Sequence, residues 1–222
     1  MIMKFLARIK SQLVLTCFAV LFFSTQALFD SPNVQTRKDY IAPPIEIKYL
    51  TNGFATQASD SFWLRAIQDM DYCEQPINEK ECSGQSWLFS VINMTVELDK
   101  NFTEAYYYGA LALSILISDY SGASIIFDKG VRLFNKNWPL LYAAGYHALL
   151  EEKNKLKASN LYLAAVENGA PDWVRLMAGR LASEGGNNKL AKEILQELIK
   201  FEANSLWIEK LRKKIDKMEV SN

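Results

Sequence analysis

Small and apolar residues return along most of this chain at intervals of 33 to 35 positions. Three such series share one register: Leu88, Ala123, Ala158 and Ala191; Ile92, Phe127, Tyr162 and Leu195; Thr95, Gly130, Ala165 and Leu198. A fixed period of this length is the mark of a repeat architecture, in which each unit buries its apolar face only against its neighbours. The chain is therefore expected to fold as a row of similar units.

The composition favours helices as the building blocks of these units. Half of the 222 residues are apolar and 12% are aromatic, so a sizeable core is available. Glycine and proline are scarce, at 10 and 6 residues, which suits helices better than a sheet rich in turns. The formal net charge is zero, without the basic excess typical of a nucleic-acid binder, so no nucleic-acid partner is expected.

A glycine recurs in the first expected helix of each unit, as Gly109, Gly145 and Gly179, which are 36 and 34 positions apart. Small residues at a crossing let two antiparallel helices approach closely, and a large residue fills the space beside them. This pattern resembles the tetratricopeptide repeat, of the exported or membrane-anchored bacterial type. The resemblance implies an all-α, right-handed superhelix of about three to four helix pairs with a C-terminal capping helix.

The resemblance assigns residues 58–222 to one helical-repeat domain. Its expected first unit has helices around Ala58 to Tyr72 and Ser86 to Leu98. The later units are expected at about Thr103 to Phe134, Pro139 to Asn168 and Pro171 to Phe201, followed by a last helix at about Ser205 to Met218. The charged residues of that helix are expected to give the open end a polar outer face: Glu209, Lys210, Arg212, Lys213, Lys214, Asp216 and Lys217.

Matches and departures from the family pattern occur side by side. Leu98-Asp99-Lys100-Asn101 is similar to the family's Leu-Asp-Pro-Asn ending, and Asp119-Tyr120 to its Asp-Tyr turn. Two extra residues lie between Gly109 and Ala123, and one between Gly145 and Ala158. A long insertion, Cys73 to Gly84, interrupts the first unit, and Pro44 to Asp71 resembles the start of a group of exported bacterial repeat proteins.

The N-terminus, residues 1–29, has the layout of a targeting segment. Lys4, Arg8 and Lys10 precede the continuous apolar stretch Leu13 to Phe23, and small residues precede a possible cut after Ala27. This pattern is typical of a secretory signal peptide, and an uncleaved membrane anchor is the alternative. Either reading exports the rest of the chain, because the positive flank stays in the cytoplasm. Residues 30–57, with Pro32, Pro43, Pro44 and Asn52-Gly53, are expected to form an extended linker.

Two cysteines, Cys73 and Cys82, lie in the insertion of the first unit. In an exported domain we expect them to pair as a disulfide, whereas in the cytosol they would remain thiols. They lack the nearby histidine or further cysteines that a four-ligand zinc site needs, so no metal is expected.

Catalytic and cofactor motifs are absent from the sequence. No phosphate-binding loop, dinucleotide-binding glycine pattern or metal-ligand cluster occurs, so no cofactor is expected. His147 is the only histidine, and no nucleophile motif accompanies it, so we interpret it as a helix residue of structural role. We therefore expect a protein that is not an enzyme.

The family's ligand groove is lined by the first helices of the units. Counting from the glycine of each unit, the resemblance places six groove residues: Tyr106, Ala110, Tyr142, Tyr146, Leu176 and Arg180. Trp173, which we also assign to the groove, and Arg175 lie near the same face. The alternative for each aromatic residue is packing between the repeats. An extended peptide or a helix is the expected ligand of such a groove.

These features together predict a protein-binding scaffold or adaptor of the cell envelope. We expect it in the periplasm, tethered to the inner membrane through its N-terminal segment or released, and assisting assembly of a pilus, secretion or motility machine. The alternative is a binder of a non-protein envelope ligand, such as a glycan or lipid, through the aromatic concave face.

Overall fold

The computed structural model describes residues 15–20, 42–68, 86–201 and 203–220. The chain divides into two compact units, Met1–Tyr40 and Ile41–Asn222. In the first unit, residues 15–20 form a helical segment with exposed side chains. No helix within the described ranges is long and apolar enough to cross a membrane. Most of the expected signal or anchor segment, and the expected Cys73–Cys82 disulfide, lie outside the described residues.

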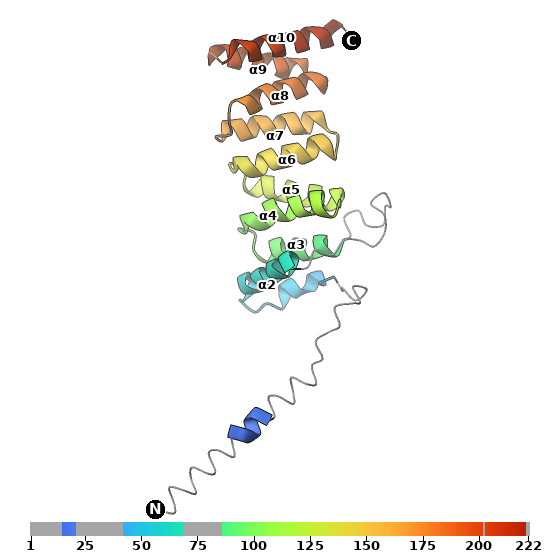
Figure 1. Cartoon of the computed structure of the whole chain (residues 1–222), viewed down its shortest axis with the longest axis vertical. Coiled ribbons are helices and arrows are strands. Elements are labelled where there is room, and N and C mark those ends of the chain that lie inside the picture. Colours follow the sequence, from blue (N-terminus) through green and yellow to red (C-terminus); the bar gives the residue numbers. More distant parts are fainter. Residues whose placement is uncertain (1–14, 21–41, 69–85, 202, 221–222) are drawn as a thin grey trace, which may run out of the picture. The chain divides into compact units, whose positions relative to one another are not determined.

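The described part of the second unit is all-α and contains no strand, which confirms the predicted fold class (Figure 1). A 3-10 helix, Ile45–Tyr49 (η2), lies in the expected linker. The α-helices and one π-helical segment (η4) are α2 Ala55–Gln68, α3 Trp87–Leu98, α4 Thr103–Leu111, η4 Ala112–Leu116, α5 Tyr120–Leu133, α6 Trp138–Leu150, α7 Lys155–Glu167, α8 Trp173–Glu184, α9 Asn188–Lys200 and α10 Ser205–Val220.

The second helix of each expected unit begins at a capping side chain. Ser86, Asp119, Asn154 and Asn187 precede α3, α5, α7 and α9, and each accepts a hydrogen bond from the backbone N–H three residues later, at 2.9 to 3.1 Å. These residues are typical N-caps because their short polar side chains satisfy a helical N–H that has no partner in the first turn. They are 33, 35 and 33 positions apart, so the starts of these helices repeat with the same period as the core.

Each helix from α2 to α10 packs against the next one along the chain, and α10 also contacts α8 (Figure 1). The expected helix pairs are therefore present as α2–α3, α4–α5, α6–α7 and α8–α9, with α10 as the last helix. Helix α2 begins at Ala55 instead of Ala58, and its expected end at Tyr72 lies outside the described residues.

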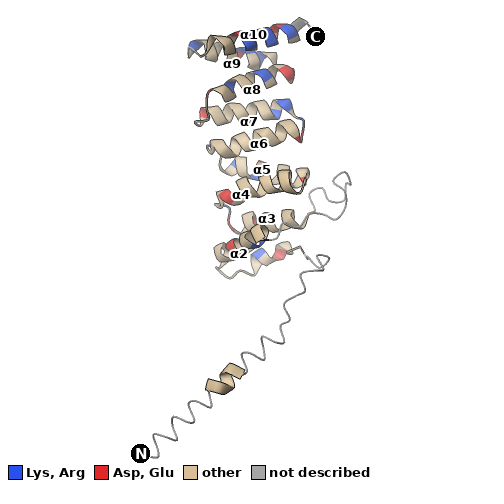
Figure 2. Cartoon of the chain, viewed as in Figure 1, with Lys and Arg blue, Asp and Glu red and all other residues tan. Residues whose placement is uncertain are grey.

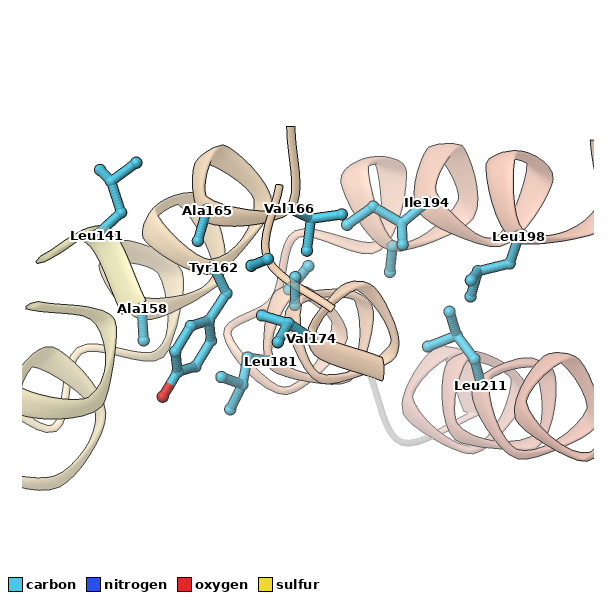
Figure 3. Packing of buried hydrophobic residues seen from close by; sticks show 14 of the residues in the cluster. Leu141, Ala158, Tyr162, Ala165, Val166, Val174, Leu181, Ile194, Leu198 and Leu211 are labelled. Carbon is cyan, nitrogen blue, oxygen red and sulfur yellow. The ribbon is translucent and has the colours of Figure 1, made fainter. Parts of the chain in front are cut away.

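The periodic residues form the core, which consists of two clusters that meet at α6. One cluster joins α2 to α6, and the other joins α6 to α10. Figure 3 shows the second cluster, with Tyr162 of α7 facing Leu181 of α8 and with Leu198 of α9 facing Leu211 of α10. In the last unit the buried large residue is Ile194, and Leu195 is only half-buried.

Two of the recurring glycines allow a close approach within their own unit. A Cβ atom at Gly145 would lie 2.8 Å from the ring of Tyr162 on α7. One at Gly179 would lie 3.1 Å from Ile194 on α9 and, closer still, 2.7 Å from Leu211 on α10. Gly109 differs, because its missing Cβ faces Ile92 on α3, the helix of the preceding unit, at 2.8 Å. Helix α4 thus presents its glycine to another neighbour than α6 and α8 do.

The two extra residues of the second unit are accommodated by an irregular turn. After Leu111 the α-helix widens into the π-helical segment η4, and Ser118 then takes a left-handed conformation, with φ of 57°. The backbone N–H of Asp119 donates to the carbonyl oxygen of Leu113 at 2.8 Å, which closes the turn before α5. Single π-helical turns of this kind commonly absorb an inserted residue.

Candidate partner-binding surface

Two of the predicted groove residues, Tyr106 and Ala110, belong to the core and cannot contact a partner. Their exposed fractions are 1% and 0%. The ring of Tyr106 packs against Phe134 with 5.5 Å between centroids, and its hydroxyl donates a long hydrogen bond of 3.4 Å to the carbonyl oxygen of Val96. Burial raises the pKa of Tyr106 to about 12, so the hydroxyl remains a donor.

This correction follows from the orientation of α4. Counting groove positions from the glycine of each unit assumes that every glycine faces the same neighbour, whereas Gly109 faces α3. The exposed aromatic residue of α4 is instead Tyr108, at 57%. It lines a cavity of about 270 Å³ where α2, α3 and α4 meet, which we call the α2–α4 pocket. None of its described lining residues is charged: Trp63, Ala66, Ile67, Leu88, Ile92, Tyr108, Gly109 and Ala112.

The predicted residues on α6 and α8 lie at the surface or close to it. Tyr146 and Trp173 are 46% and 44% exposed, and Arg180 is exposed as well. Tyr142 is half-buried between Tyr162 and Trp173, with ring centroids 5.3 and 5.9 Å away. The structure therefore joins Tyr142 to Trp173 as one aromatic group. Arg175 points elsewhere, because it forms an ion pair with Glu197 of α9.

Three predicted residues line a cavity of about 380 Å³ between α8 and α10. Helix α10 contributes residues to it that the sequence analysis did not assign to the groove, among them Trp207. We call this cavity the α8–α10 pocket. Its lining residues are Trp173, Leu176, Met177, Arg180, Trp207, Lys210, Leu211 and Lys214. Lys210 and Lys214 had been expected on a polar outer face, but they border this pocket. The sequence contains a signal for this position, because Lys210 and Lys214 are four residues apart, next to Trp207 and Leu211, and residues at that spacing share one side of a helix.

One carboxylate, Glu184 at the end of α8, balances part of the positive charge beside this pocket. Lys214 and Lys155 lie 2.8 and 3.1 Å from its oxygens, and Arg180 lies at 3.9 Å. Burial opposes the charged form of Glu184, but hydrogen bonds from Lys214 and Lys155 outweigh it and lower its pKa. Lys210 makes no ion pair within the described part of the chain.

His147 forms a buried polar cluster that no sequence motif predicts. Its Nδ1 lies 2.9 Å from Ser114 Oγ in η4, and its Nε2 lies 2.9 Å from Ser124 Oγ in α5. Ser124 also donates to the carbonyl oxygen of Tyr120 at 2.9 Å. This pattern fits a neutral imidazole with its proton on Nε2, which donates to Ser124 while Nδ1 accepts from Ser114.

The cluster does not have the geometry of a hydrolytic triad. A triad needs a carboxylate on the imidazole nitrogen opposite the nucleophile. Here both nitrogens face serine hydroxyls, and Glu152 lies 4.0 Å from Nε2, on the same side as Ser124. Burial lowers the pKa of His147, and the nearby Glu152 only partly opposes this effect. The cluster thus joins η4, α5 and α6 through satisfied hydrogen bonds.

A comparison of the chain with protein-family models, with curated proteins and with solved structures found no match. Among the described residues, no three side chains of His, Cys, Asp or Glu gather as a metal site.

Proposed function

We propose that this chain is a protein-binding scaffold or adaptor that holds its partner against the first helices of its helix pairs. The observation that carries the proposal is the α8–α10 pocket together with the exposed rings of Tyr146 and Trp173 on the neighbouring helices α6 and α8. Aromatic and arginine side chains in a partly apolar recess are the residue types that dominate protein interfaces.

The finer architecture belongs to this proposal. We infer a tetratricopeptide-like, right-handed superhelix whose concave face is formed by α2, α4, α6, α8 and α10. The 33-to-35-residue period of core residues and N-caps supports it, as does the contact of α10 with α8 across the intervening α9. The two pockets described above are each lined by two helices of this set, α2 with α4 and α8 with α10, and α3 also contributes to the first.

The proposed location is the cell envelope, where the N-terminal segment serves as a signal peptide or a membrane anchor. The proposed partner is a protein that takes part in assembly of an envelope machine. Its support is the sequence of residues 1–29. A binding role is also favoured over a catalytic one, because the buried His147 has both nitrogens engaged by serines. Intact-mass analysis of the fractionated protein tests the location: retention of Met1 in the membrane fraction fits an anchor, and a soluble start at Leu28 fits a cleaved signal.

Chemical cross-linking in cells, followed by purification of the full-length chain and mass spectrometry, tests the binding function. Wild type and the outer-surface variant Gln196→Ala should capture the same protein, and Tyr146→Ala should capture several-fold less. Tyr146 is half exposed, so its truncation leaves the core intact. The absence of a reproducible protein partner, or equal capture by all three chains, contradicts the proposal.

A second candidate function is binding of an envelope glycan or lipid at the same surface, because Tyr146 and Trp173 expose ring faces on which sugars can stack. It predicts that the purified chain binds cell-wall fragments or lipid vesicles, that Tyr146→Ala weakens this binding, and that no protein is captured.

A further inference from the structure

We propose that the α8–α10 pocket takes an acidic peptide segment that inserts one large apolar side chain. This inference rests on the proposed protein-binding function and adds the chemistry of the bound segment. It assigns the acidic preference to one end of the helix array, at α8 and α10.

The apolar part of the ligand follows from the walls of the pocket. Trp173, Leu176 and Met177 come from α8, and Trp207 and Leu211 come from α10. The cavity of about 380 Å³ lies at the low end of the ~300–1,000 Å³ typical of ligand pockets, so it suits one anchoring side chain. Leu211 is buried, whereas Trp173 is half exposed, so the recess has a closed base and an open aromatic edge.

The acidic part follows from the charges on the rim. Arg180, Lys210 and Lys214 border the pocket, and among the described residues the one carboxylate that pairs with any of them is Glu184. Glu184 is bonded to Lys214 at 2.8 Å and also to Lys155, so it cannot neutralise Lys210 or fully neutralise Arg180. Two cations therefore remain available to a carboxylate of the ligand, and a guanidinium can bind it through two parallel hydrogen bonds.

This positive charge is local, because the whole chain has a formal net charge of zero. Figure 2 shows Lys and Arg concentrated on α10, whereas α6 carries no charged residue. The α2–α4 pocket lies between corresponding helices of the first two pairs, and none of its lining residues in the described part of the chain is charged. An acidic ligand thus gains at α8–α10 and has nothing to gain at α2–α4.

Panning a random twelve-residue peptide library against the folded full-length chain tests the inference. We expect enrichment of peptides in which Asp or Glu flank a Phe, Trp or Leu. The best peptide should bind with a salt-dependent Kd and change the fluorescence of the pocket tryptophans. Replacing its acids by amides, or its apolar anchor by serine, should weaken binding about tenfold.

Charge reversal on the protein locates the site. Lys210→Glu and Arg180→Glu should each weaken the acidic peptide about tenfold, while Lys136→Glu, the same change at an exposed residue between α5 and α6, should not. Circular dichroism of the variants confirms that they remain folded, which is expected because Lys210 and Arg180 are exposed.

Three results would overturn the inference. The first is enrichment of neutral or basic peptides; if these lose binding in Tyr146→Ala, the protein-binding function stands while the acidic preference fails. The second is an acidic peptide that binds the Lys210→Glu variant as tightly as the wild type. The third is no peptide enrichment together with Lys210-dependent binding to phosphatidylglycerol-containing vesicles, which would assign the rim to a lipid surface.

Discussion

The pair α4–α5 packs its two helices together differently from the pairs α6–α7 and α8–α9. In α6–α7, Gly145 receives the ring of Tyr162 from its partner helix, and in α8–α9, Gly179 receives Ile194 of α9 together with Leu211 of α10. In α4–α5, Gly109 faces the preceding helix, and a π-helical segment and buried polar contacts complete the unit. The neighbour that the glycine of a first helix faces thus goes together with which aromatic residues of that helix reach the surface: in α4, Tyr106 is buried and Tyr108 is exposed.

The largest expected effect is at the centre of the regular region. Tyr162→Ala should lower the free energy of unfolding by about 3–5 kcal/mol, because it leaves a cavity where α6, α7 and α8 meet. Tyr146→Ala, at the residue next to Gly145 but half exposed, should cost less than about 1 kcal/mol. Urea denaturation measures both, and similar losses in the two variants would contradict the assignment of Tyr162 to the core.

The N-caps give a sharper contrast between the two regions. Asp119 is buried, caps α5 and accepts a 2.6 Å hydrogen bond from Ser86, the cap of α3. Asn187 caps α9 at an exposed position. Asp119→Ala should therefore cost about 2–3 kcal/mol, because it also leaves the buried Ser86 hydroxyl without its partner, whereas Asn187→Ala should cost about 1 kcal/mol. Thermal unfolding of the two variants measures the two losses. Equal decreases in Tm would show that the hydrogen bond between Ser86 and Asp119 adds no stability.

The histidine cluster makes the irregular region sensitive to pH. Folding buries His147 in its neutral form and lowers its pKa below the ordinary 6.5, so the unfolded chain binds more protons below that pH. This contribution to stability is complete above pH ~6.5 and is lost as the pH falls below it, with a slope of at most ~1.4 kcal/mol per pH unit.

The matched variant for this prediction is His147→Gln, which should have a flatter stability profile between pH 6.5 and 5. The carboxylates of Glu152 and Glu184, whose pKa values are lowered from 4.5, contribute stability that is lost mainly below this window. A wild-type profile that stays flat from pH 7 to 5 would contradict burial of a neutral His147.

The smallest expected effect is a difference in stability between variants of two buried tyrosines. The hydroxyl of Tyr162 finds no hydrogen-bond partner among the described residues, whereas that of Tyr106 donates to Val96. Tyr162→Phe should leave the stability unchanged or raise it by up to about 1 kcal/mol, and Tyr106→Phe should lower it by about 0.5 kcal/mol. The reverse order in chemical denaturation would show that the Tyr162 hydroxyl is satisfied.

Much of the fold was predictable because its signals are local and periodic. The spacing of Ala123, Ala158 and Ala191 predicted the second helices, and all three are fully buried. The π-helical turn was not predictable in form, since two extra residues before Ala123 indicate an insertion but not whether a helix or a loop absorbs it.

The candidate surface was predictable only where the units are regular. Tyr146 and Trp173 are exposed as expected, but Tyr106 is buried because α4 presents Gly109 to α3. Lys210 was predicted on an outer face because α10 was interpreted as a capping helix, although α10 packs on α8 as the first helix of another unit would. Both errors concern the rotation of one helix about its axis, which depends on contacts distant in the sequence.

Site-specific photo-cross-linking in cells tests the central claim, that one face of this array holds a protein partner. A photoreactive amino acid would replace Tyr146 on α6, Arg180 on α8 or, as the control, Gln196 on the exposed side of α9. The account predicts the same protein adduct from positions 146 and 180 and none from position 196. Adducts from position 196 alone, or from no position, would contradict it.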